Sequence, residues 1–111
     1  MTKKILWSQD ATDDLLEILD YIKEKSGAVR AYEIYTRIID HVERIDSFPE
    51  SRRIIPELMT LGIRDIRELI EKPWRIFYRV MPHEIQIISV IDGRRNVEEI
   101  LYKKVIDGKI S

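Results

Sequence analysis

Three apolar runs between residues 62 and 95 constrain this chain more than any other feature of its sequence. They are rich in isoleucine and aromatic residues, and short breaks at residues 71–73 and 81–84 separate them. Runs of this length, bounded by proline and charge, predict consecutive antiparallel strands. Because side chains alternate between the two faces of a strand, Arg75 and Arg79 are expected on the same face. We therefore expect a three-strand meander that buries one face and presents guanidinium groups on its open face.

The residues before the meander predict a short strand and a helical hairpin. The strand is expected at residues 4–7, and Ser8 can cap the first helix because its hydroxyl accepts a free N–H of the first turn. Gly27 interrupts the helical pattern, and a second helix is expected over residues 28–46. Very few residues join the two helices, so they should form an antiparallel hairpin. The expected buried positions recur at helical spacing and are Ala11, Leu15, Ile18, Ile22, Ala31, Tyr35, Ile38, Val42 and Ile45, with Tyr32 and Ile39 alongside.

The hairpin also carries side chains that have both a structural and a functional interpretation. Tyr32 and Tyr35 can stack on a nucleic-acid base, but packing in the core is the favoured interpretation. A group of carboxylates lies mostly off the apolar stripe of the first helix, and a solvated face is favoured over a carboxylate site. These carboxylates are Asp13, Asp14, Glu17, Asp20 and Glu24.

A loop precedes the meander and a short helix follows it. Residues 54–58 should lie across the edge of the domain, and Glu57 is interpreted as part of a structural clamp there. Asn96 can cap a helix that continues to Val105, since its side chain accepts a free N–H of the first turn. Residues 107–111 should fray, as chain ends commonly do.

The order of these elements predicts an α+β domain. It consists of a small, mainly antiparallel sheet with an N-terminal strand, a helical hairpin on one face, a three-strand meander and a short C-terminal helix. With 111 residues and no internal repeat, residues 1–111 are expected to form one domain.

Composition argues against several kinds of site. The chain has no cysteine, so neither a disulfide framework nor a thiolate metal site is expected. No set of histidines and carboxylates has the spacing of metal ligands, and neither a metal nor a cofactor is expected. No apolar run approaches the roughly 20 residues that span a bilayer, and the first residues do not have the pattern of a signal peptide. We therefore expect a cytoplasmic protein without a membrane partner.

Charge is distributed unevenly along the chain. Residues 1–50 carry 7 basic and 11 acidic side chains, a net charge of −4, and residues 51–111 carry 12 basic and 9 acidic side chains, a net charge of +3. The total of −1 therefore does not exclude an anionic partner for the basic half. A solvated helical surface beside a solvated sheet explains the asymmetry equally well.

Six local strings, each weak by itself, occur in a defined order along the chain. They are Trp7-Ser8 followed by an acidic helix through Asp14-Leu15, Ile18 and Tyr21-Ile22; Phe48-Pro49; Pro56-Glu57-Leu58; Ile66-Arg67-Glu68-Leu69; Trp74-Arg75-Ile76-Phe77-Tyr78-Arg79; and Val90-Ile91-Asp92-Gly93-Arg94-Arg95. Together they resemble the RelE/ParE superfamily of type II toxin–antitoxin toxins, also called plasmid stabilisation proteins. The resemblance covers about residues 4–101 and implies the fold derived above.

The resemblance implies one of two activities, and a shared fold does not choose between them. RelE-like members cut messenger RNA in the ribosome without a metal, whereas ParE-like members bind DNA gyrase and stall it on cleaved DNA. In both branches a neighbouring antitoxin wraps the toxin and suppresses it, so a cognate antitoxin protein is the first expected partner. A degenerate, non-toxic member that only binds its antitoxin is a third alternative.

The chemistry of RNA cleavage helps to separate the two branches. Cleavage through the 2′-hydroxyl needs a base, an acid and cations that stabilise the charged phosphorane. Arginine suits the third role because its fork matches phosphate oxygens, but its pKa of about 13 makes it a poor base. If the chain is a ribonuclease, the resemblance implies that the catalytic residues are Arg67, Arg75, Arg95 and Tyr102.

Two of these four residues depart from the ribonuclease pattern. Arg67 stands where lysines are expected, and Tyr102 follows Arg95 about one residue late, on a predicted helix. The phosphate-binding half of the site is therefore better matched than the acid–base half. We favour the ParE-like branch, a toxin that inhibits DNA gyrase by binding, and keep ribosome-dependent cleavage of messenger RNA as the alternative.

The residues expected to bind a partner are Arg67, Trp74, Arg75, Arg79, Arg94 and Arg95. Arg75 is the best functional candidate among them. Arg67 and Arg79 have the alternative role of pairing with a carboxylate such as Glu68 or Glu71, and this alternative is favoured for Arg79. The antitoxin is expected to lie over the groove of the sheet near Arg67, Arg75 and Arg95.

Overall fold

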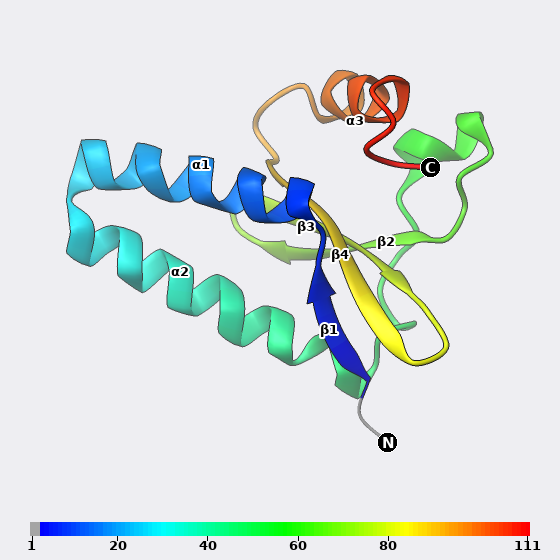
Figure 1. The fold of residues 1–111 in the computed structure, drawn as a ribbon, viewed down its shortest axis with the longest axis horizontal. Helices are drawn as coiled ribbons and strands as arrows, with labels where there is room; N and C mark the ends of the chain where they lie inside the picture. Colours follow the sequence, from blue (N-terminus) through cyan, green and yellow to red (C-terminus); the bar gives the residue numbers. More distant parts are fainter. Residues whose placement is uncertain (1–2) are drawn as a thin grey trace.

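The computed structural model describes residues 3–111, and its elements follow the expected order (Figure 1). They are β1 (Lys4–Trp7), α1 (Gln9–Ser26), α2 (Ala28–Glu43), the 3₁₀ helices η1 (Ile45–Ser47) and η2 (Pro56–Leu61), β2 (Ile66–Glu71), β3 (Trp74–Val80), β4 (Glu84–Asp92) and α3 (Val97–Ile106). The expectation about a signal peptide falls partly on residues 1–2, which lie outside the described residues. Within the described part of the chain, no helix has the length and apolar character to cross a membrane.

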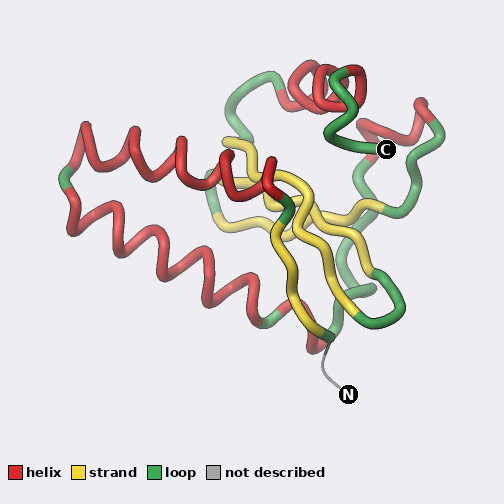
Figure 2. Tube along the Cα trace, viewed as in Figure 1, coloured by secondary structure: helices red, strands yellow, loops and turns green. Residues whose placement is uncertain are grey.

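The four strands form one mainly antiparallel sheet in the order β1-β4-β3-β2, so the predicted α+β fold class is confirmed (Figure 2). β2, β3 and β4 are the predicted meander, and β1 pairs with β4 in parallel. The β3–β4 pairing is irregular at one point, where Phe77 pairs with Ser89 but Tyr78 pairs with Ile87. The extra residue, Ile88, is a β-bulge. The bulge shifts the alternation of β4 by one residue, so that Ile85, Ile87 and Val90 all reach the core under the hairpin, while Ile88 and Ile91 reach the core on the other face.

The helical hairpin forms as its end signals predict. Ser8 Oγ accepts the N–H of Ala11 at 3.0 Å, which caps α1. Gly27 has a φ of 91°, a value that glycine adopts readily, and it lets the chain leave α1 and enter α2 directly. The turn between the two helices projects beyond the sheet (Figure 1). The core between hairpin and sheet contains Ala11, Leu15, Ile34, Ile38, Val42, Ile45, Leu69, Trp74, Ile76, Tyr78, Ile85, Ile87 and Val90.

The second face of the sheet is covered, and the expectation of an open face is wrong. Side chains of η2, α3 and the C-terminal tail meet the sheet in a second core, formed by Ile55, Leu58, Ile66, Phe77, Ile88, Ile91, Val97, Leu101 and Ile110. Phe77 is fully buried there, between the two arginines that flank it on the same face of β3. The apolar residues of η2 and α3 need a surface to cover, and the sheet provides it.

Two expectations about the hairpin are also wrong. α2 ends at Glu43, three residues early, because the chain tightens into the 3₁₀ turn η1. Tyr32 and Tyr35 are 67% and 40% exposed, and Ile34 occupies the buried position instead. Ile34 and Ile38 are four residues apart and share the face toward the sheet, whereas the tyrosines lie on its flank.

The C-terminal tail packs on the second core and does not fray as expected. Ile110 is 3% exposed, and its N–H and that of Lys109 both donate to the carbonyl oxygen of Lys104. Arg79 Nη2 donates to the carbonyl oxygen of Ser111 at 2.6 Å. Burial of the apolar side chain of Ile110 therefore adds to these hydrogen bonds in holding the tail.

We expect Ile38→Ala to destabilise the fold strongly, because Ile38 is completely buried under α2. Truncating such a side chain removes apolar contacts and leaves a cavity, which costs about 2–5 kcal/mol of unfolding free energy. Ile106→Ala is the matched control, since Ile106 is 82% exposed and should lose little. Urea denaturation of both variants makes the comparison, and equal losses would contradict this description of the core.

Candidate functional site

A pocket of about 430 Å³ lies where α1, the start of β3 and the end of β4 meet. Its lining residues are Asp14, Glu17, Ile18, Tyr21, Ile22, Trp74, Val90, Asp92, Arg94 and Arg95. Three of the six residues predicted to bind a partner, Trp74, Arg94 and Arg95, are thus brought together here. The remaining three, all arginines, lie elsewhere on the sheet.

The pocket has an apolar wall and a charged rim. Ile18, Ile22 and Trp74 supply apolar side chains, and the β4–α3 loop supplies two arginines. Arg94 Nη2 lies 2.7 Å from Asp92 Oδ2, and this hydrogen-bonded guanidinium holds the pKa of Asp92 below its usual value. Arg95 is exposed and has no carboxylate within 4.0 Å among residues 3–111. Its charge is therefore available to an anionic group of a partner.

Gly93 positions these arginines by allowing a close approach between two turns. Its N–H donates to the carbonyl oxygen of Pro73 at 2.8 Å. A Cβ atom at Gly93 would lie 3.0 Å from that oxygen and 3.4 Å from the Arg75 side chain, so a larger residue would force the turns apart. The Asp92-Gly93-Arg94-Arg95 string consequently keeps the loop beside Trp74.

Arg75, the best functional candidate from the sequence, lies on the opposite side of the sheet from the hairpin. Its Nη1 donates to Glu57 Oε2 at 2.7 Å, its Nη2 donates to Glu68 Oε2 at 2.8 Å, and its guanidinium lies over the Phe77 ring. Burial alone would lower the pKa of Arg75, but the hydrogen bonds to both carboxylates outweigh it and raise that pKa. Glu57 thus forms the predicted structural clamp, and Arg75 is its other half.

The other predicted residues also have partners within the chain. Arg67 Nη1 donates to the carbonyl oxygen of Arg52 at 2.6 Å, so its partner is a backbone oxygen and not the carboxylate of the alternative interpretation. Arg79 pairs with a carboxylate as favoured: its Nε lies 2.8 Å from Asp65 Oδ2, although the two atoms are not aligned as a hydrogen bond.

The four residues implied for a ribonuclease do not converge in this structure. Arg67 is the cross-strand partner of Tyr78, whose side chain lies in the hairpin-side core, whereas Arg75 faces the second core. Tyr102 lies on α3 with its hydroxyl 3.1 Å from Thr60 Oγ1, and Arg95 lines the pocket. One phosphate cannot contact Arg67 and Arg75 together across a sheet. The four ribonuclease residues therefore remain a prediction, because this conformation does not bring their side chains together.

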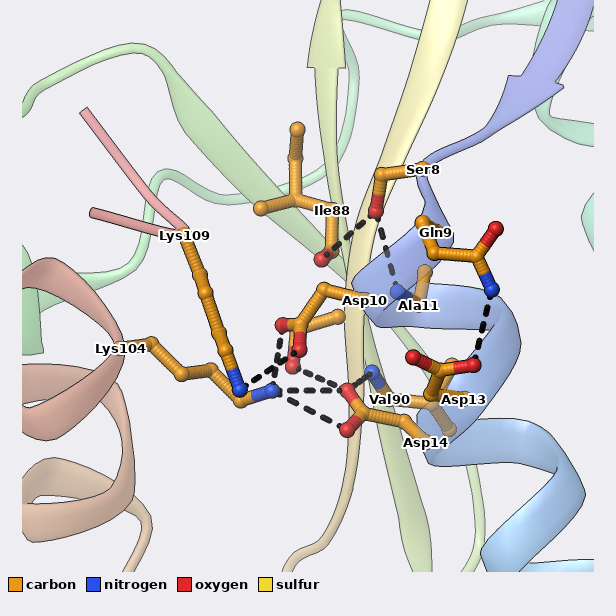
Figure 3. A network of polar contacts seen from close by, with 11 residues as sticks. Ser8, Gln9, Asp10, Ala11, Asp13, Asp14, Ile88, Val90, Lys104 and Lys109 are labelled. Carbon is orange, nitrogen blue, oxygen red and sulfur yellow. Dashed lines mark hydrogen bonds and ion pairs between the residues drawn. The ribbon is translucent and has the colours of Figure 1, made fainter. Parts of the chain in front are cut away.

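An ionic cluster that the sequence analysis missed connects α1 with α3 (Figure 3). Lys104 Nζ donates to Asp10 Oδ2 at 2.5 Å and to Asp14 Oδ1 at 3.0 Å. We call Asp10, Asp14 and Lys104 the lysine clasp. Asp14 was interpreted as part of a solvated face, and this is wrong because its carboxylate accepts four hydrogen bonds.

A signal for the lysine clasp was present in the sequence. Lys104 continues the buried stripe of α3 that includes Val97 and Leu101, and it is 8% exposed. A lysine on an apolar stripe implies a buried carboxylate partner, because a charge removed from water must be paired. Within residues 3–111, no group of three or more histidines and carboxylates is arranged to hold a metal ion.

Comparison with known proteins identifies the family of this chain. A family model described as the ParE toxin of type II toxin-antitoxin system, parDE, matches residues 5–97. The chain belongs to this family. Toxin ParE3 from Caulobacter vibrioides is 26% identical over 101 residues, which are 91% of this chain and 97% of that protein. The resemblance to the RelE/ParE superfamily is therefore confirmed, and the matching family is the ParE branch.

A solved structure supports the fold of this ParE-family chain. A chain of the chromosomal ParDE TA system from P. aeruginosa matches with a TM-score of 0.69 and 22% identity. The match covers 82% of the present chain and 96% of the other. At this identity the likeness supports the arrangement of elements alone.

We expect Arg75→Ala to destabilise this protein, because among residues 3–111 it leaves the buried Glu68 carboxylate, 2% exposed, with the largely exposed Arg53 as its one ion-pair partner. Breaking a buried ion pair on one side costs about 3 kcal/mol or more. Arg64→Ala is the control, since Arg64 is exposed. Chemical denaturation compares the two variants, and an Arg75→Ala protein as stable as the parent would contradict the clamp.

The clamp between Glu57 and Arg75 should also make the unfolding free energy depend on pH. Hydrogen bonding to Arg75 lowers the pKa of Glu57 from its usual value of 4.5. The stabilisation from Glu57 is therefore complete above pH 4.5 and is lost as the pH falls through the lowered pKa. Glu57→Gln should be less stable than the parent at neutral pH, and the difference should shrink in acid. Urea denaturation between neutral and acidic pH measures it, and a constant difference would exclude this role.

Proposed function

We propose that this ParE-family chain is the toxin of a type II toxin–antitoxin module and inhibits DNA gyrase by binding it. The observation that carries the proposal is the location of the arginines. Arg75 is neutralised by Glu57 and Glu68, and it lies on the other face of the sheet from Arg67. The cations that would stabilise a phosphorane are therefore dispersed, whereas the pocket offers a formed surface for a protein partner.

We place the gyrase contact at the pocket. Trp74 and the apolar residues of α1 can receive an apolar side chain, and the exposed Arg95 can meet a carboxylate beside it. An antitoxin encoded beside the toxin would suppress it by covering the same surface. We propose a smaller contribution to partner binding from the other three arginines, because each already has a partner within the chain. These are Arg67, Arg75 and Arg79.

Growth after induced expression of this chain alone tests the proposal, with DNA and messenger RNA analysed from the same culture. Gyrase poisoning predicts growth arrest with broken DNA, an induced DNA-damage response and intact message. Cleaved message with intact DNA would instead support the ribonuclease alternative and its set Arg67, Arg75, Arg95 and Tyr102. Normal growth would support the non-toxic alternative. The expected site of action is the cytoplasm, where gyrase and DNA are.

We expect Arg95→Ala to reduce toxicity without unfolding the protein, because Arg95 is exposed and its charge faces the pocket. Truncating a residue that carries binding energy at an interface costs about 2 kcal/mol, which is roughly a 30-fold loss of affinity. Arg64→Ala is the control and should stay toxic, since Arg64 is also exposed and does not line this pocket. Growth curves at matched expression compare them. Equal toxicity of both variants would move the contact away from the pocket.

A further inference from the structure

Asp14 belongs both to the lysine clasp and to the pocket. It lines the pocket, and its carboxylate accepts hydrogen bonds from Lys104 Nζ at 3.0 and 3.1 Å. Its Oδ2 also accepts the hydroxyl of Ser89 at 2.7 Å. The same oxygen accepts the N–H of Val90 at 3.0 Å (Figure 3). Val90 is itself a pocket residue on β4. The carboxylate therefore joins the α1 wall of the pocket to the β4 wall.

Lys104 keeps two carboxylates together at this junction. Burial alone would lower the pKa of Lys104, but the hydrogen bonds to Asp10 and Asp14 outweigh burial and raise it. The lysine is thus a cation at neutral pH. The other ammonium nearby belongs to Lys109, which lies 3.6 Å from Asp10 Oδ1 and is half exposed. Solvent screens this second pair more strongly than the buried one.

We propose that Lys104 is a positioning residue for partner binding: through the lysine clasp, α3 holds the α1 wall of the pocket against β4 and thereby sets the shape of the pocket. The inference rests on the proposed function, in which the pocket receives the partner. Lys104 is not among the residues that line the pocket. It acts through Asp14, so the C-terminal helix influences binding at a surface it does not form.

The mechanism is charge repulsion when the ammonium is absent. Asp10 and Asp14, one turn apart on α1, then repel each other, partly buried, without the cation between them. As their side chains turn apart, the Asp14 carboxylate leaves the hydroxyl of Ser89 and the N–H of Val90, and α1 loses this polar link to β4. The wall that Asp14 and Val90 share then opens.

Fluorescence of Trp74 reports the shape of the pocket without any partner. The chain has two tryptophans, so Trp7→Phe leaves Trp74 as the reporter in the pocket wall. In this background Lys104→Met keeps the length and the apolar stem of the side chain but removes its charge. Lys103→Met is the matched control, because Lys103 is the exposed neighbour on the same helix.

Lys104→Met should shift the emission of Trp74 to longer wavelength and raise its acrylamide quenching constant, while Lys103→Met should change neither. A purely packing role for Lys104 would not be rescued by removing the charge of Asp10. Unchanged Trp74 emission in a folded Lys104→Met protein overturns the proposal.

A second variant keeps the test decisive if Lys104→Met does not fold. Lys104→Met combined with Asp10→Asn leaves one carboxylate, that of Asp14, which retains its donors on Ser89 and Val90. The double variant should fold and return the Trp74 signal toward that of the parent. A double variant that remains unfolded, or one whose Trp74 stays as exposed as in the single variant, excludes charge repulsion as the cause.

Toxicity then links the pocket to function and separates the two proposals. Lys104→Met should need roughly tenfold more protein than the parent for the same growth arrest, a loss of about 1.4 kcal/mol in binding, and Lys103→Met should match the parent. If the parent is not toxic, the proposed function fails while the fluorescence still decides whether the clasp shapes the pocket. Full toxicity of a Lys104→Met protein with an opened pocket overturns the positioning role.

Discussion

Burial of both faces of one small sheet is the constraint on which the rest of this structure depends. β3 alternates between two cores: Ile76 and Tyr78 face the helical hairpin, and Phe77 faces η2 and α3. With four strands, neither core is large, so each needs the other to keep the strands in place. The bulge at Ile88 adapts β4 to this arrangement, because it shifts the alternation by one residue and lets both Ile87 and Val90 face the hairpin.

Covering the second face brings charged side chains into partly buried positions. In each case the charge is paired with a side chain of opposite charge. Arg75 ties η2 to β2 through Glu57 and Glu68, and Lys104 ties α3 to α1 through two aspartates. Both clusters join segments that are distant in sequence. Buried pairs of this kind are weak evidence for net stability but strongly restrict how the segments fit together. The loops around the sheet consequently have one defined arrangement.

The same constraint separates arginines that look alike in the sequence. Arg67 and Arg75 are directed to opposite faces, and the loop after β4 leaves Arg94 and Arg95 exposed beside the apolar wall of the pocket. The position of an arginine in the fold therefore decides whether it serves packing or remains available for binding. This distinction supports a binding function at the pocket over a catalytic one spread across the sheet, and it agrees with membership of the ParE toxin family.

The sequence by itself determined the elements, their order and the family resemblance, because periodicity, caps and turn residues act over a few neighbours. Ser8 and Asn96 cap their helices as predicted, and Gly27 ends α1. Only the tertiary structure decided that the second face is buried, that Ile110 packs in the core and that Asp14 meets Lys104. These contacts join residues far apart along the chain, and their partners depend on how the layers stack, which local patterns do not encode.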